Sequence, residues 1–304
     1  MKKRLISGTL YMLILAGFYC LKIFLPKGYG DLCFDALLCA FAFIGSFEIL
    51  RAFKDKTTKA ERIITFIFSA ITIPACALAE YFPFLPFGSG IVVVGACGCL
   101  YAVALFALLI VSYDETSLES LGFSLLSALY PTLLLCVLVL ANHSVGITGL
   151  EKFGFDSRLF ILLLFVISPT SDSIAFVFGC SLKKYFPKKL APKLSPNKTV
   201  IGGIGGIVGG MLGATVVYFG YALLMYGSLD NMYIWLPVFL GIGALASVAT
   251  ELGDLVESGI KRKVGLKDMG NIMPGHGGIL DRIDGTLFSA IVIYGCFTLV
   301  RLIA

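Results

Sequence analysis

The sequence is poor in charge. Asp, Glu, Lys and Arg make up 14% of the 304 residues, against about a quarter in an ordinary soluble domain, and 58% are hydrophobic. Apolar stretches of roughly 20 residues, the length that crosses a bilayer, recur from one end of the chain to the other. This excludes a soluble globular protein and predicts one polytopic membrane domain.

Histidine is also scarce, and the cysteines do not make up for it. The chain has two histidines and nine cysteines. Apart from Cys97 and Cys99, which are surrounded by small apolar residues, no cysteine has a second Cys or His at metal-ligand spacing. We interpret all nine cysteines as small apolar fillers, and a cysteine-based metal site is excluded.

The formal net charge is +5, and the basic residues lie in short polar segments between the apolar runs. We therefore interpret the positive charge as a signal of how the chain is oriented in the membrane. With the N-terminus in the cytoplasm, 19 of the 24 Lys and Arg residues fall on the inside, as the positive-inside rule requires. The first apolar run, Leu5 to Leu25, is too long for a signal peptide, so we expect an anchor that is not cleaved. No nucleic-acid partner is expected.

The predicted fold is all-α, with about nine transmembrane helices. The expected spans are 5–25, 31–50, 63–81, 91–112, 121–141, 159–180, 200–226, 234–253 and 286–303. We divide the chain into N-terminal helices (1–150), whose role is open, and a C-terminal catalytic region (151–304). Two long polar connections, 181–199 and 254–285, both face the cytoplasm and are where function is expected.

The stretch from Glu251 to Asp284 is dense in charge. Glu251 and Asp254 lie three residues apart, Asp254 and Ser258 four apart, and Asp281 and Asp284 three apart, so each pair shares one helix face. Two helix ends are therefore expected to present carboxylates to one pocket, and this suits Mg²⁺ bound together with phosphate oxygens. The bases that would hold those phosphates are Lys261, Arg262, Lys267 and Arg282.

The turn from Pro274 to Gly278 places His276 among three glycines, where the backbone can approach a ligand closely. His276 could donate to phosphate or move a proton near neutral pH. The alternative is a solvated loop whose charges only fix topology. Fixing the topology requires neither the carboxylates of this stretch nor the three glycines around His276, so we favour a functional site. His143 we interpret as an ordinary interfacial residue.

A second polar segment precedes the glycine-rich run IGGIGGIVGG. Ser195 followed by Pro196 is typical of a helix start, and with Lys198 it predicts an anion site at the membrane surface. The glycines recur every four residues, which favours close helix packing over a phosphate cradle.

Asp172 lies inside the sixth span, where a carboxylate is costly and by default functional. The alternative is a carboxylate satisfied by its serine neighbours. Asp35 and Glu48, near the ends of the second span, are expected to reach the interface, and we give them no role.

Sixteen positions between Ser258 and Asp284 match one known signature. They are Ser258, Ile260, Lys261, Arg262, Lys267, Asp268, Gly270, Pro274, His276, Gly277, Gly278, Ile279, Asp281, Arg282, Ile283 and Asp284. With this pattern the chain resembles the CDP-diacylglycerol synthase (phosphatidate cytidylyltransferase) family. Met273 departs from the usual Leu, Ile or Phe, a swap of similar volume. A second feature of the family is similar to Asp172, Ala175 and Phe176 of this chain together with its turn Ser195–Thr199. Two positions differ: this chain has Phe176 where the family has Tyr, and Asn197 where the family has Lys.

The resemblance implies that CTP and phosphatidate give CDP-diacylglycerol and pyrophosphate at the bilayer, with Mg²⁺ and a possible second metal ion. It implies metal binding by Asp254 and Asp281, with Asp284 as the matching neighbour. The expected catalytic set is Asp254, Asp281, Lys261, Arg262, Arg282 and His276, and the expected substrate-binding set is Ser195, Lys198, Thr199, Ser258, Lys267, Asp268, Gly277, Gly278 and Asp172. A homodimer is possible.

Two alternatives stay open at this point. One is a related CTP-dependent membrane enzyme that acts on another lipid phosphate or on a lipid alcohol. The other is a secondary transporter, suggested by Asp172 and the glycine-interrupted seventh span. No second copy of either polar loop occurs in the first half of the chain, which disfavours the transporter.

Overall fold

The protein is seen in a computed structural model that describes residues 2–26, 28–83, 88–144, 156–226, 229, 232–275 and 277–303. The chain forms two compact units. Unit 1 contains residues 1–143 and 264–282, and unit 2 contains residues 144–263 and 283–304. The segment 264–282, which carries much of the signature, therefore folds with the N-terminal helices.

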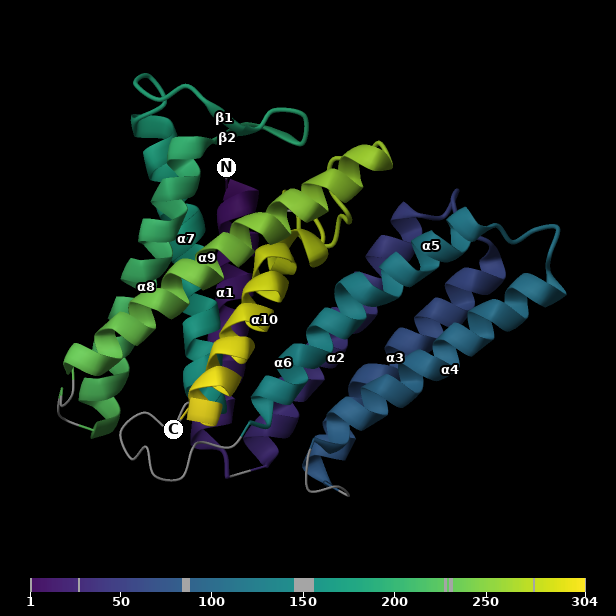
Figure 1. Ribbon diagram of the computed structural model, residues 1–304, viewed down its shortest axis with the longest axis horizontal. Helices are drawn as coiled ribbons and strands as arrows, with labels where there is room; N and C mark the ends of the chain where they lie inside the picture. Colours follow the sequence, from purple (N-terminus) through teal and green to yellow (C-terminus); the bar gives the residue numbers. More distant parts are fainter. Residues whose placement is uncertain are drawn as a thin grey trace. The chain divides into compact units, whose positions relative to one another are not determined.

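Within the described residues, nine helical segments are long and apolar enough to cross a membrane, which confirms the predicted fold class. Unit 1 has α1 (Lys2–Phe24), α2 (Tyr29–Ala52), α3 (Lys59–Tyr81), α4 (Ser89–Val111), α5 (Leu118–Ser127), the π-helical turn η1 (Ala128–Leu133) and α6 (Leu134–Asn142). Unit 2 has α7 (Ser157–Ser181), β1 (Lys189–Ala191), β2 (Ser195–Thr199), α8 (Val200–Tyr226) and α9 (Met232–Lys263). The last helix, α10 (Leu280–Ile303), begins in unit 1 and continues in unit 2 (Figure 1).

Two helices are longer than predicted. Helix α9 continues past 253 to Lys263, and α10 begins at Leu280 instead of 286. An apolar pattern ends where the lipid ends, but a helix keeps its own backbone hydrogen bonds in water and can continue as a charged rod. Asp254, Ser258 and Lys261 therefore lie on a helix and not in a loop.

In unit 1, α5, η1 and α6 form one continuous span. Pro131 lacks an N–H group and lies in the π-helical turn, where the widened helix accommodates it. The core of the unit includes Phe34, Leu38 and Ile49 from α2, all at most 1% exposed. Helix α2 packs against α3, and both contact the α5–α6 span.

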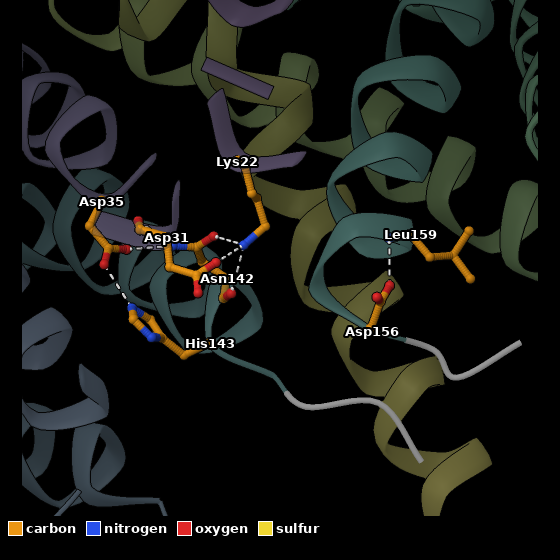
Figure 2. A network of polar contacts seen from close by, with 7 residues as sticks. All are labelled: Lys22, Asp31, Asp35, Asn142, His143, Asp156 and Leu159. Atoms are coloured by element: carbon orange, nitrogen blue, oxygen red, sulfur yellow. Dashed lines mark hydrogen bonds and ion pairs between the residues drawn. The ribbon is translucent and has the colours of Figure 1, made fainter. Parts of the chain in front are cut away.

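A buried polar network closes one end of unit 1 (Figure 2). Lys22 pairs with Asp31 and donates to the Asn142 backbone and side-chain oxygens at 3.0 and 2.6 Å. The carboxylate of Asp35 accepts from Asn142 at 2.8 Å and lies 2.7 Å from His143 Nε2. The prediction that Asp35 reaches the interface is wrong, because the carboxylate is buried and joins α2 to the end of α6.

In unit 2, the glycines of α8 set the helix spacing, as predicted. A Cβ at Gly209 would lie 2.6 Å from the Thr170 carbonyl oxygen of α7, and one at Gly210 would lie 2.7 Å from the Gly243 carbonyl oxygen of α9. Only glycine allows the two neighbours to approach α8 this closely.

We expect Gly210→Ala to lower the stability of the protein by about 1–3 kcal/mol, because the added methyl group forces α8 and α9 apart. Gly220→Ala on the same helix is the matched control, since its Cβ would meet nothing within 4 Å. That variant should be neutral, or stabilised by up to about 1 kcal/mol. Thermal unfolding of both purified variants in detergent measures the difference; equal midpoints would contradict the packing role.

The prediction of a helix start at Ser195 is wrong. Ser195–Thr199 forms strand β2, which pairs antiparallel with β1 in a short hairpin at the end of α7 and α8 (Figure 1). Helix α8 begins at Val200, and the Thr199 hydroxyl accepts from the Gly202 N–H at 3.1 Å. A proline can lie in a short strand whose N–H side is unpaired, so Ser-Pro alone does not fix a helix start.

Candidate active site

Unit 2 contains a polar pocket of about 490 Å³ between α7, β2, α8 and α9. Four predicted site residues line it: Asp172 from α7, Lys198 and Thr199 from β2, and Asp254 from α9. The other lining residues are Ala175, Phe176, Gly179, Cys180, Lys183, Leu190, Asn197, Gly202, Gly203 and Glu251. Acidic and basic side chains that are far apart in the sequence thus line the same pocket.

An ion pair joins two walls of this pocket. Lys198 Nζ lies 2.6 Å from Asp254 Oδ2, and both side chains are about one third exposed. The Ser258 hydroxyl, one helical turn further along α9, lies 3.4 Å from Asp254 Oδ1. Asp254 is therefore oriented from two sides while it stays open to a ligand.

Glu251 is a pocket residue that the prediction left out of the site. Its Oε1 atom is buried and has no hydrogen-bond partner among the described residues, and the same holds for Ser171 Oγ. Both atoms lie next to Gly206, where a Cβ would collide with Glu251 and come within 3.2 Å of Ser171. The three-residue spacing predicts that Glu251 and Asp254 share one helix face, and the pocket confirms this, although the prediction assigned no role to Glu251.

A third carboxylate lies near Asp254 because α9 and α10 cross at small residues. The Gly253 Cβ position would be 2.5 Å from the Asp284 carbonyl oxygen, and Gly285 contacts Thr250. The charge of Asp284 interacts with that of Asp254. Glu257, also absent from the predicted set, pairs with Lys261 at 2.6 Å.

Five carboxylates gather at this end of unit 2: Asp172, Glu251, Asp254, Glu257 and Asp284. Ion pairs join Asp254 to Lys198 and Glu257 to Lys261. In the part of the chain that the structure covers, no three His, Cys, Asp or Glu side chains form a ready metal cage. One or two carboxylates completed by water and phosphate are what Mg²⁺ requires, so the donor set fits that ion.

In unit 1, the signature loop 264–279 is held by two buried carboxylates. Asp281 Oδ2 accepts from the Met269 and Gly278 N–H groups at 2.9 and 2.7 Å. Glu48 of α2 accepts from the Ile279 and Leu280 N–H groups at 3.1 and 3.0 Å. The prediction that Glu48 reaches the interface is wrong, because it is 2% exposed and binds the first turn of α10.

The glycines of the loop allow these contacts. A Cβ at Gly270 or Gly278 would collide with the Glu48 carboxylate, and Gly277 has a φ of +84° beside Asp281. Gly278 therefore has a packing contact and a backbone hydrogen bond whatever ligand it also meets.

The other predicted residues are more exposed. Arg262 lies at the exposed end of α9, Lys267 and Asp268 lie on the exposed part of the loop, and Arg282 is exposed on α10. Ser195 lies on β2 and does not line the pocket. His276 lies outside the described residues. Asp254 and Asp281 belong to different units, so their predicted approach stays a prediction.

The fold defines a class, an all-helical integral membrane protein, and its pocket brings acidic and basic side chains together. The model of the cytidylyltransferase family matches residues 2–300. The chain therefore belongs to this family and, with the predicted signature, to its CDP-diacylglycerol synthases (phosphatidate cytidylyltransferases).

Individual relatives agree. The phosphatidate cytidylyltransferase of Bacillus subtilis (strain 168) is 34% identical over 294 residues, which cover 95% of this chain and 94% of the relative. That of Staphylococcus haemolyticus (strain JCSC1435) is 35% identical over 185 residues, 61% of this chain and 65% of the relative. That of Staphylococcus aureus (strain COL) is 36% identical over 186 residues, with the same shares.

Proposed function

We propose that this chain performs the reaction of its family at the polar pocket of unit 2. CTP and phosphatidate give CDP-diacylglycerol and pyrophosphate, a step of phospholipid biosynthesis. The observation that carries the location is the pocket in which Lys198, Asp254 and Asp172 meet from three elements. We place this pocket at the cytoplasmic face, because the bases of the hairpin and of the end of α9 follow the positive-inside pattern.

The chemistry needs positioning more than a protein nucleophile. The phosphatidate oxygen is anionic at neutral pH, so it attacks the α-phosphorus of CTP directly. The new P–O bond forms as the bond to the β-phosphate oxygen breaks, and pyrophosphate leaves with both electrons of that bond. The protein must bring two anions together and hold them in line.

Lys198 is suited to neutralise phosphate charge, since its ammonium group lies in the pocket and already pairs with a carboxylate. An arriving phosphate competes with Asp254 for Lys198 and leaves Asp254 available for a cation. Mg²⁺, when bound, supplies charge neutralisation for the triphosphate and the departing pyrophosphate. Asp254, with Asp284 near it, would hold this ion, and the family signature adds Asp281.

The test is transfer of label from [α-³²P]CTP to the lipid by purified protein in mixed micelles. We expect label in CDP-diacylglycerol only when CTP, phosphatidate and Mg²⁺ are all present. EDTA should abolish the transfer and excess Mg²⁺ should restore it. Transfer that is unaffected by EDTA would contradict the metal role.

The same assay separates the alternative substrates. Lysophosphatidate, a polyprenyl phosphate and diacylglycerol take the place of phosphatidate in parallel reactions. Phosphatidate should be preferred by at least about tenfold, since one binding difference of 1.4 kcal/mol suffices for that factor. A lipid alcohol would accept the γ-phosphate of CTP and leave CDP, so that reaction is followed with [γ-³²P]CTP. A stronger reaction there would identify the related enzyme instead.

A further inference from the structure

A second cavity lies in unit 1, on the side of α2 and α3 near the loop that joins them. It has a volume of about 440 Å³, and its lining falls into two parts. Five residues are apolar: Phe47, Leu50, Ile63, Phe66 and Ile67. The other four, Arg51, Lys54, Lys59 and Arg62, are all basic, and we call the whole the α2–α3 groove.

The groove has a fixed rim. The Arg62 guanidinium donates to the carbonyl oxygens of Lys54 and Thr57, both at 2.6 Å. The Thr58 capping box starts α3 at Lys59. Arg62 thus fixes the loop that carries the other bases, so the groove does not need a ligand to form.

Three bases at the rim are not neutralised. Arg51, Lys54 and Lys59 are exposed, and none has an ion pair or side-chain hydrogen bond in the described part of the chain. The Glu61 carboxylate is buried and faces α5, where it accepts from Ser120 at 2.6 Å. Asp55, the acid of the loop, does not line the groove.

Lys59 is placed unfavourably for an isolated helix. It is in the first turn of α3, where the helix dipole adds positive potential to that of the side chain. An anion at the rim relieves this repulsion. The positive-inside rule explains why bases lie near this loop. It does not explain why they converge on one groove, or why Phe47, Ile63 and Ile67 are exposed beside them.

We propose that the α2–α3 groove binds one anionic phospholipid, with the phosphate headgroup on Arg51, Lys54 and Lys59 and an acyl chain along the apolar part. Charge complementarity favours this occupant, because the nine lining residues hold four bases and no acid. A second protein copy would need a matching acidic, apolar face. The groove lies in unit 1, and it shares no lining residue with the proposed catalytic pocket in unit 2.

Fluorescence quenching by brominated lipids tests the proposal on the full chain in nanodiscs. The chain has one tryptophan, so Trp235→Phe with Phe66→Trp gives a single reporter in the groove. Dibrominated phosphatidylglycerol should quench this reporter with at least about tenfold preference over dibrominated phosphatidylcholine. Each base near an anionic lipid contributes about fivefold.

The variant Arg51→Gln/Lys54→Gln/Lys59→Gln should lose that preference. Lys56→Gln is the matched control: it removes a base of the same loop, but Lys56 pairs with Glu119 and does not line the groove. It should keep the preference. Equal quenching by the two lipids, or a preference that survives the triple variant, would overturn the proposal.

Two further arms separate other occupants. Inorganic phosphate at 10-fold molar excess over the lipid should not displace it; displacement would show an anion site without a lipid chain. If neither lipid quenches the reporter while Ile63→Cys cross-links two chains that stay separate in the protein with Ile63, the groove holds a second copy and the proposal is wrong. Native mass spectrometry of the unsubstituted protein, with the two lipids in competition, gives the same comparison without the reporter.

Discussion

Replacing Asp254 by Asn is expected to lower cytidylyl transfer by at least about 10²-fold with little change in the amount of folded protein. Asn keeps the volume of Asp but loses the charge that faces Lys198 and the proposed metal ion. Loss of one preorganised electrostatic group commonly costs about 10²–10³ in rate. Labelled-CTP transfer by purified variants, normalised to the monodisperse protein peak, measures the effect.

Two further variants separate catalysis from structure. Asp114→Asn is the matched control, because Asp114 is an exposed acid of the α4–α5 connection and lines none of the cavities described above. It should retain full activity. In the double variant Lys198→Asp/Asp254→Lys the two charges change places. If the pair only held β2 to α9, this variant would be active; we expect it to be as inactive as Asp254→Asn.

Replacing Glu48 by Ala is expected to destabilise the protein by about 3–5 kcal/mol and to reduce activity more than tenfold. The substitution removes the acceptor of the Ile279 and Leu280 N–H groups. A buried N–H group without an acceptor costs free energy, because it is bonded neither to protein nor to water. The substitution also opens a space beside Gly270 and Gly278. The signature loop should then lose its fixed conformation.

Hydrogen exchange measures where the change occurs. Peptides covering 270–283 should exchange faster in Glu48→Ala, while those of α8 should not change. Glu80→Ala is the matched control, because Glu80 of α3 accepts from the Gly90 N–H at the start of α4 at 2.7 Å in the same way. It should lower stability but leave activity per folded molecule unchanged. Slow exchange at 270–283 in Glu48→Ala would refute the role of Glu48.

Much of the fold could be predicted from the apolar pattern. A segment that crosses a bilayer as a helix must be of a certain length and must satisfy its backbone hydrogen bonds within itself. The ends of α9 and α10 were misplaced for the same reason, since hydropathy marks the lipid boundary and not the last backbone hydrogen bond. Spacing along one helix correctly grouped Asp254 with Ser258. It gave no means to find Glu48, whose partners lie more than 200 residues away.

The sequence by itself determined the membrane class, the helical fold, the family and the acid and base types of the site, since composition, hydropathy and a spaced signature are properties of the chain alone. Only the tertiary structure decided that Lys198 pairs with Asp254, that Glu251 lies in the pocket and that Glu48 holds the first turn of α10. These depend on how closely helices pack, and the contacts of Gly206, Gly253 and Gly278 set that distance in three dimensions.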